Sequence, residues 1–231
     1  MKSGRAYASP HSLSRPRRQK VLDRVLPKGP KVDTLQIPGI DRRTLRGCST
    51  TIHFMPPHEA IAHEFSESEM APPETMTLPP CYHSNPVVQK ARDNGDPLPQ
   101  PLILFLDGVR YTAMLAGRSD SVLGIWVRSW ATGKRHLCAA LRVSNMCRCG
   151  CKGWCTIYPV LSACAFSFMN MATGVRPNFT FDGKQRLDSD PYSVSQAGPA
   201  LGYTAMLLWI TGIRGQSQLS ATCIHVAHVS L

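Results

Sequence analysis

The chain has 231 residues, a formal net charge of +11 and a hydrophobic fraction of 43%. That length allows one or two domains with a core of ordinary size. The N-terminus is polar and rich in arginine, and no apolar run reaches the roughly 18–20 residues that a bilayer span requires. These features argue against a secreted or membrane protein, so we expect a nuclear or cytoplasmic protein with no membrane partner. The oligomeric state does not follow from the sequence.

Charge is distributed unevenly along the chain. Residues 1–50 carry a net charge of +9, residues 51–100 a net charge of −5, and the remaining residues a net charge of +7. A basic segment of this kind is suited to polyanions such as DNA or RNA, and the alternative is a solvated extension without a partner. The 19 prolines and 17 glycines favour one packed region with irregular flanks. Residues 1–52 are therefore predicted to be a disordered basic arm.

Prolines dominate residues 53–100. A short helix is predicted over residues 57–65, because proline fits a first helical turn and acidic side chains are favourable there. Beyond this helix, the pairs Pro72-Pro73 and Pro79-Pro80 predict an extended segment. This region is therefore predicted to be a short helix followed by a Pro-rich linker.

Residues 101–212 carry the clearest pattern of secondary structure. Three apolar segments with short connections predict an antiparallel meander of three strands: residues 102–106, which end at Asp107-Gly108 and which residues 109–112 could extend, residues 121–130, and residues 135–143. A helix is predicted from an N-cap at Thr156 to Gly174, with a buried stripe formed by Val160, Cys164, Phe168 and Met171. Residues 202–210 predict a fourth strand. We therefore expect an α/β (α+β) domain.

This order of elements is typical of the first half of the ribonuclease H-like fold. In that fold the central first strand carries a catalytic aspartate, and Asp107 lies at the end of the most buried strand here. Magnesium requires oxygen ligands, and two such ions held by converging carboxylates would cleave a phosphodiester bond. The alternative is that Asp107 and Gly108 form a turn that ends the strand.

A second carboxylate is expected at or just beyond the fourth strand. However, the final 41 residues contain no Asp or Glu. The other acidic residues of this half fall in polar loops that cannot hold a preorganised pair: Asp120, Asp182, Asp188 and Asp190. The sequence therefore predicts a vestigial site at Asp107 without catalysis, and Mg²⁺ only if the protein were catalytic.

Four cysteines lie within nine residues in the pattern C-x-C-x-C-x-x-x-C: Cys147, Cys149, Cys151 and Cys155. Thiolates suit a tetrahedral zinc ion, nearby Lys and Arg side chains stabilise thiolates, and glycines let a short loop wrap around an ion. The spacing differs from paired C-x-x-C motifs, so Cys138, Cys164 or His136 could replace one ligand. The alternatives are a metal-free reduced turn and redox chemistry. Trp154 is expected to be a packing anchor rather than a base-stacking platform.

Several segments together resemble one protein family: PPHE at 56–59, NPVV at 85–88, DGVRYT at 107–112, SVLG at 121–124, TGKRHL at 132–137, residues 146–158, and DG at 182–183. On these segments the chain resembles, over about residues 52–212, a large uncharacterised family of dinoflagellate proteins. The cysteine run is the most specific part. The resemblance implies a mobile-element protein laid out like a cut-and-paste transposase with a ribonuclease H-like core. Residues 213–231 form a tail that departs from the family, which continues with an Asp-Trp segment.

These observations predict an incomplete transposase-like protein that binds nucleic acid without catalysis. The alternative is a zinc-stabilised, non-enzymatic module that binds protein or RNA. A third alternative is a gene product that has lost part of its sheet and has no stable fold. DNA binding that weakens with salt favours the first prediction, and binding that survives high salt favours the second.

Overall fold

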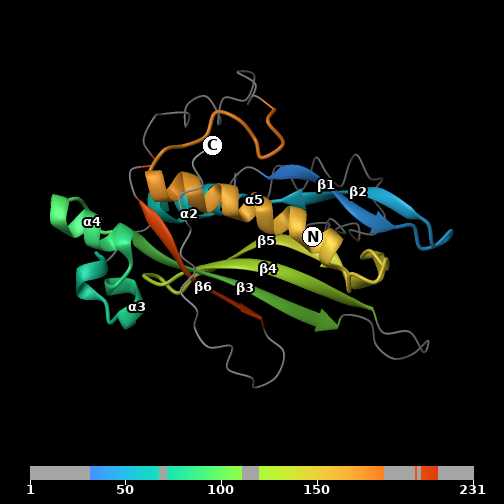
Figure 1. The fold of residues 1–231 in the computed structure, drawn as a ribbon, viewed down its shortest axis with the longest axis horizontal. Helices are drawn as coiled ribbons and strands as arrows, with labels where there is room; N and C mark the ends of the chain where they lie inside the picture. The colour runs from blue at the N-terminus through green and yellow to red at the C-terminus, as the bar shows by residue number, and fades with distance from the viewer. Residues whose placement is uncertain (1–31, 68–71, 111–119, 185–200, 202–203, 213–231) are drawn as a thin grey trace, which may run out of the picture. The chain divides into compact units, whose positions relative to one another are not determined.

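The computed structural model describes residues 32–67, 72–110, 120–184, 201 and 204–212. They form a mixed α/β fold whose curled sheet has six strands in the order β1-β2-β5-β4-β3-β6. Four helices pack with the sheet in the described part of the chain, and α5 crosses over it (Figure 1). The predicted α/β class is confirmed.

The predicted meander of three strands forms one half of the sheet. It consists of β3 (Gln100–Arg110), β4 (Ser121–Ser129) and β5 (Arg135–Arg142). β4 pairs antiparallel with β3 on one side and with β5 on the other. Residues 101–105 of β3 are all buried, which explains their continuous apolar run. The meander is therefore confirmed.

A long helix and a parallel strand complete the predicted order. α5 (Trp154–Thr173) buries the whole predicted stripe against the sheet. β6 (Ala205–Gly212) then lies beside β3 and runs parallel to it, with Leu106 paired to Gly212. The fourth strand is confirmed, although it begins and ends slightly later in the chain than predicted.

By length and composition α5 also resembles a membrane-spanning helix. The helix contains no charged side chain, but polar residues interrupt it, so it does not form one continuous apolar run in the sequence. Core helices of water-soluble proteins share this property, and seven side chains of α5 are buried within the fold. The helix therefore serves as the main core element of the sheet's covered face.

A β-hairpin replaces the end of the predicted basic arm. β1 (Asp33–Ile40) and β2 (Gly47–Phe54) pair antiparallel along their full length. Leu35 and Ile37 are buried while the residues between and around them are exposed. The surrounding charges and prolines obscured this short alternation, which is the signal of a half-buried strand.

The hairpin belongs to the same sheet as the meander, because Phe54 of β2 pairs with Ala139 of β5. Strands from both sides of the predicted boundaries at residues 52 and 100 therefore share one sheet. The described residues all belong to one compact unit. The rest of the predicted arm, residues 1–31, and the predicted tail, residues 213–231, lie outside the described residues.

The predicted Pro-rich linker contains two further helices. The first helix, α2 (Pro57–Glu67), is confirmed, but α3 (Pro80–His83) and α4 (Pro86–Asn94) follow where an extended chain was predicted. Each begins with a proline, which is tolerated there because the first N–H groups of a helix have no partner within it. Asn85 caps α4 by accepting a hydrogen bond from the Val87 amide. These prolines mark helix starts.

The two faces of the sheet carry separate cores. On one face, α2 and α5 pack over β3, β4 and β5. On the other, Met206 and Leu208 of β6 pack with Leu78, Tyr82 and Val88 from the segment of α3 and α4. Alternation along β6 explains the division, because neighbouring strand residues point to opposite faces. The described sheet is therefore covered on both faces at β6.

Candidate metal centre

The four cysteines of the predicted cluster lie together in the turn between β5 and α5. A short 3-10 helix, η4 (Val143–Asn145), leads into this turn. The sulfur atoms of Cys147, Cys149, Cys151 and Cys155 all lie within 4.8 Å of one another. Among the described residues this is the one group of three or more potential ligands that could hold a metal ion. The cysteine prediction is therefore confirmed as a cluster.

Left-handed backbone conformations let nine residues bring four sulfurs together. Gly150, Lys152 and Gly153 have φ values of 91°, 53° and 86°. Glycine adopts this region at little cost, and Lys152 is one of two non-glycine residues there in the described ranges. A β-carbon at Gly153 would lie only 3.0 Å from the sulfur of Met146. Glycine at this position is therefore required both by conformation and by space.

Thr156 fixes the turn to the rest of the fold. Its hydroxyl oxygen accepts a 2.8 Å hydrogen bond from the Cys147 amide and donates a 2.7 Å bond to the carbonyl of Pro38. The sequence predicted Thr156 as the N-cap of α5, but the helix begins at Trp154 after Gly153. The prediction was wrong because the hydroxyl serves the cysteine turn and β1 rather than the helix's own amides.

The sulfur geometry suits tetrahedral coordination. The sulfurs of Cys149 and Cys155 are 3.7 Å apart. Metal–sulfur bonds of about 2.3 Å at tetrahedral angles place ligand sulfurs about 3.8 Å apart. In addition, the Cys155 amide donates a 3.4 Å hydrogen bond to the sulfur of Cys151. Such a bond favours a thiolate, which is the form that binds metals.

The cysteines differ in their readiness to lose a proton. The Cys155 amide, helped by thiol donors, lowers the pKa of Cys151 to about 6. The Cys155 thiol donates to Cys151, and this bond raises the pKa of Cys155 to about 12. One negative charge is therefore concentrated on Cys151 in the metal-free turn. A divalent cation would compensate for the loss of further protons from the cluster.

None of the predicted substitute ligands takes part. Cys138 on β5 and Cys164 on α5 are both buried in the core between the sheet and this helix. His136 instead lies 2.5 Å from a carboxylate oxygen of Glu64, which is itself buried and also accepts from Thr132. The alternative that one of these side chains replaces a cysteine is therefore not supported, because the left-handed backbone already brings the four cysteines together.

Trp154 does not have its predicted packing role. Its side chain is 54% exposed, and that of Tyr158 one turn later is 58% exposed. The prediction was wrong because Trp154 begins α5 on the face that points away from the sheet.

Asp107 lies inside β3 rather than at its end. It pairs with Gly124, and the strand continues through Gly108 to Arg110. An Asp-Gly turn at this position is therefore excluded. Alternation places Asp107 half-buried on the face opposite the α5 core, and Leu106 beside it is the last β3 residue paired with β6.

The other acidic candidates do not join Asp107. Asp120 forms ion pairs with Arg142 at 2.8 Å and Arg42 at 3.6 Å. Asp182 is paired with Lys184 at 2.6 Å. Asp188 and Asp190 lie outside the described residues. Within the described ranges, no acidic group therefore accompanies Asp107 in a metal site.

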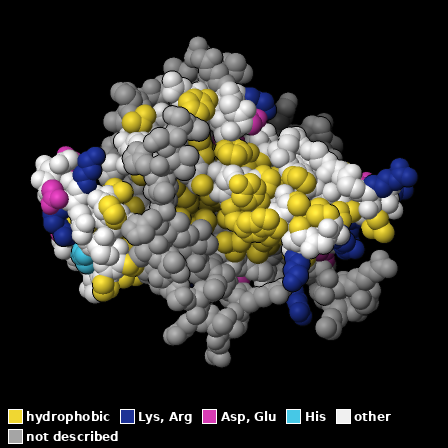
Figure 2. Space-filling view, viewed as in Figure 1, with side chains coloured by type: hydrophobic (Ala, Val, Ile, Leu, Met, Phe, Trp, Pro, Cys, Tyr) yellow, Lys and Arg dark blue, Asp and Glu magenta, His cyan; other side chains and the backbone are white. Residues whose placement is uncertain are grey.

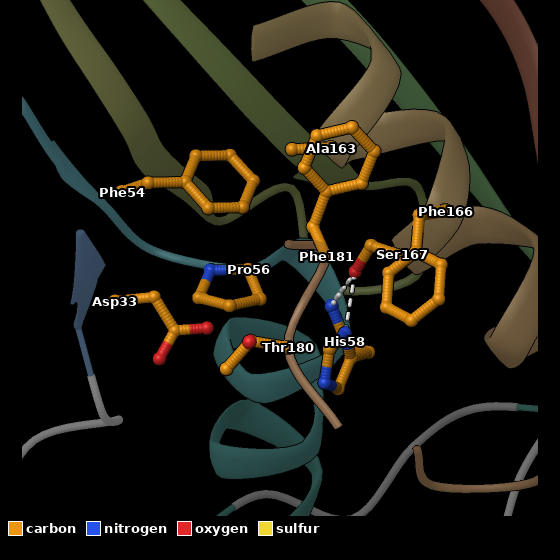
Figure 3. Close-up of a pocket in the computed structure, with 9 residues that line it drawn as sticks. All are labelled: Asp33, Phe54, Pro56, His58, Ala163, Phe166, Ser167, Thr180 and Phe181. Carbon is orange, nitrogen blue, oxygen red and sulfur yellow. Dashed lines mark hydrogen bonds between the residues drawn. The ribbon is translucent and has the colours of Figure 1, made fainter. Parts of the chain in front are cut away.

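A buried polar cluster between α2 and α5 was missed by the sequence analysis. Ser167 lies 2.6 Å from Nδ1 of His58 and also accepts a 2.9 Å hydrogen bond from the His58 amide. Nε2 of His58 lies 3.5 Å from Glu59, which pairs with Arg176. Figure 3 shows His58 and Ser167 beside a small pocket with phenylalanine side chains around it. All four side chains are at most 9% exposed, so the cluster joins helices rather than contacting solvent.

The only sequence signal for this cluster was the placement of polar residues on apolar helix faces. Ser167 lies between the stripe residues Cys164 and Phe168 of α5, and its partner His58 is more than one hundred residues earlier. A single sequence does not reveal such a pairing.

Comparison of the chain with protein-family models, with curated proteins and with solved structures finds no significant match.

Proposed function

We propose that this protein is a zinc-stabilised, non-catalytic nucleic-acid-binding protein, descended from a transposase-like enzyme with a ribonuclease H-like core. The cluster of four cysteines within 4.8 Å carries the proposal. Zinc is the metal that suits it best, because four soft thiolate ligands in a tetrahedron without an open position form a structural zinc site. Zinc would close a turn that otherwise contains one concentrated negative charge at Cys151.

The strand order supports a ribonuclease H-like ancestry. The order β5-β4-β3-β6, with β6 parallel to β3 after a helical crossover, follows the opening half of that fold. Asp107 lies on β3, where the catalytic aspartate of such enzymes is expected. The strand order bears only on ancestry, because one fold can serve many functions. The binding function is argued from the cysteine cluster and from the charge of the chain.

The proposed loss of catalysis is supported by the small number of carboxylates around Asp107 among the described residues. A two-metal nuclease needs several converging acids, and Asp107 has no acidic companion among the described residues. No Asp or Glu occurs after Asp190 anywhere in the sequence. The protein would retain binding but not phosphodiester cleavage.

Charge supports nucleic acid as the partner. The net charge is +11, and residues 121–181 contain seven Lys or Arg and no Asp or Glu. Contacts between such cations and phosphates are weakened by salt, because binding releases counterions from the nucleic acid. A zinc site made of thiolates requires reduced cysteines, which the predicted nuclear or cytoplasmic location would provide.

The proposal is tested on the full-length protein by following nucleic-acid binding and circular dichroism before and after treatment with a chelator. We expect nucleic-acid binding that depends on salt. Removal of zinc should abolish this binding and part of the helical signal, and addition of zinc should restore both. Nucleic-acid binding that is unchanged by the chelator would show that binding does not require a metal in the cysteine cluster. Cleavage of DNA in the presence of Mg²⁺ would contradict the loss of catalysis.

A second candidate function is a protein-interaction module. It is favoured by exposed apolar side chains in the segment after α5, where Phe179 and Phe181 are 47% and 40% exposed and both rings contact that of Phe166. Exposed apolar groups that gather on one surface often mark a protein interface. Partner binding that persists at high salt, without nucleic acid, would favour this candidate.

A further inference from the structure

Two aromatic rings stand side by side on the exposed start of α5. The rings of Trp154 and Tyr158 have centroids 5.9 Å apart at an interplanar angle of 49°. Both side chains are more than half exposed. They are four residues apart and therefore lie on one face of the helix, one turn from each other. Large aromatic side chains are usually buried, so a solvated pair at one position requires an explanation.

The cysteine turn holds this pair in place. The Trp154 amide donates a 3.0 Å hydrogen bond to the carbonyl of Cys151, and Cys155 follows directly in sequence. A metal ion bound by Cys151 and Cys155 would therefore fix the backbone on both sides of Trp154. A rigid platform loses little conformational entropy when it binds a ligand.

Basic side chains lie on the cysteine turn that precedes the pair and near the ends of the strands that lead to this turn or contact it. Arg148 and Lys152 are exposed on the cysteine turn itself. In the β1–β2 turn and at the end of β5, the guanidinium groups of Arg42 and Arg142 meet at Asp120 while remaining 49% and 44% exposed. Figure 2 shows hydrophobic side chains on the face where α5 lies and Lys and Arg side chains toward the end where the β1–β2 hairpin turns.

The balance of charge at this end is positive even after the metal site is counted. Zinc with four thiolates carries a formal charge of −2, which Arg148 and Lys152 offset. The hairpin turn, the end of β5 and the residue before β4 add four arginines against two aspartates: Arg42, Arg43, Arg46 and Arg142 against Asp41 and Asp120. This end of the protein is therefore complementary to a polyanion.

We propose that this aromatic and basic surface binds single-stranded nucleic acid, with unpaired bases stacked on Trp154 and Tyr158 and phosphates held by Arg148, Lys152 and the neighbouring arginines. The inference rests on the proposed nucleic-acid-binding function and names its surface and its substrate class. Aromatic faces stack on any unpaired base, whereas the bases of a duplex are already stacked on one another. Cations alone would not distinguish the two forms.

The test compares oligonucleotides on the zinc-loaded, full-length protein by fluorescence anisotropy. The probes are a 12-nucleotide oligo-dT, the matching oligo-rU, and a DNA duplex of the same length. The variants are Trp154→Ala, Tyr158→Ala and the double variant. Met169→Ala is the matched control, because Met169 is also exposed on α5 but lies at its other end. Zinc content and circular dichroism are measured on each variant.

We expect the wild type to bind the single strands at least about tenfold more tightly than the duplex, and each ring removed to weaken single-strand binding by about tenfold, with Met169→Ala unchanged. Tyr158→Phe keeps an aromatic ring that can stack on a base, so we expect it to bind single strands as tightly as the wild type, unlike Tyr158→Ala. The arms with dT and rU show whether DNA or RNA is preferred. Joint substitution Arg148→Gln and Lys152→Gln weakens binding to all probes and reduces its salt dependence.

Three outcomes would overturn the inference. A zinc-loaded double variant that binds single strands as tightly as the wild type would remove the rings from the interface and leave the proposed function intact. A wild type that binds no probe would end the proposed function as well. Self-association that is lost in the double variant, with oligonucleotide binding unchanged, would identify a protein interface. If Trp154→Ala fails to fold, the result with Tyr158→Ala tests the inference, because Tyr158 lies beyond the last cysteine of the cluster.

Discussion

The hydroxyl of Thr156 donates a 2.7 Å hydrogen bond to the carbonyl oxygen of Pro38, which ties the first turn of α5 to a strand 118 residues earlier. The same oxygen accepts from the Cys147 amide. One side chain therefore joins three parts of the fold: the hairpin, the cysteine turn and the core helix.

Thr156→Val is expected to lower the free energy of unfolding by about 1–3 kcal/mol. Valine has nearly the same shape, so the change leaves the Pro38 carbonyl and the Cys147 amide, both in part-buried hydrogen bonds, without their partner. Thr173→Val is the control, because that exposed hydroxyl bonds only within its own helix. Urea denaturation of both variants checks the prediction, and equal stability of the two would contradict it.

Gly124→Ala is expected to destabilise the sheet by about 1–3 kcal/mol, because overpacking forces side chains away from their preferred positions. A β-carbon at Gly124 would lie 2.4 Å from the indole nitrogen of Trp126, which stacks on Phe105. Gly108→Ala on the adjacent strand is the matched control, since its β-carbon would meet open space. Thermal unfolding should separate the two variants clearly. If Gly108→Ala costs as much as Gly124→Ala, the packing around Trp126 is not as described.

Tyr82→Phe is expected to destabilise the second core by about 1–2 kcal/mol. Tyr82 is fully buried and donates a 2.6 Å hydrogen bond to the Pro99 carbonyl, and burial raises the pKa of its hydroxyl above the ordinary value. Tyr158→Phe removes an exposed hydroxyl and should change stability by less than about 0.5 kcal/mol. A chemical denaturation series compares them, and an unchanged midpoint for Tyr82→Phe would argue against this core.

Cys151 is expected to be the most reactive thiol of the cluster in the metal-free protein. Its pKa is lowered to about 6, so the thiolate is present above that pH, while the Cys155 pKa of about 12 keeps that thiol protonated. Iodoacetamide labelling followed by mass spectrometry should give a rate at Cys151 that rises through pH 6 and levels off above pH 7. Zinc should suppress the labelling. A rate at Cys151 that only begins to rise near pH 8–9, as for an ordinary thiol, would contradict the prediction.

The sequence predicted those elements whose patterns are local. β3 was recognisable as a continuous apolar run, and α5 by a buried stripe at helical spacing. The hairpin before residue 55 was missed because Leu35 and Ile37 are the only clear alternation within a charged, proline-containing segment. α3 and α4 were missed because proline was treated as a helix breaker, whereas it begins both helices.

The candidate site was predicted in its residues but not in its surroundings. Four closely spaced cysteines point to a cluster without any tertiary information. The exposure of Trp154 and the anchor from Thr156 to Pro38 depend on which face of α5 meets the sheet, and this is decided by contacts between segments far apart in the chain. The pairing of His58 with Ser167 is long-range in the same way.

The most direct test of the central claim is the zinc content of the full-length protein, purified under reducing conditions and measured by elemental analysis. Cys149→Ser and Cys155→Ser remove two adjacent sulfurs of the cluster, and Cys48→Ser is the control, because Cys48 is an exposed thiol outside it. We expect about one zinc ion per chain in the wild type and in Cys48→Ser, and a strongly reduced zinc content in the two cluster variants. A wild type without zinc after exposure to zinc salts, or cluster variants that retain it fully, would contradict the claim.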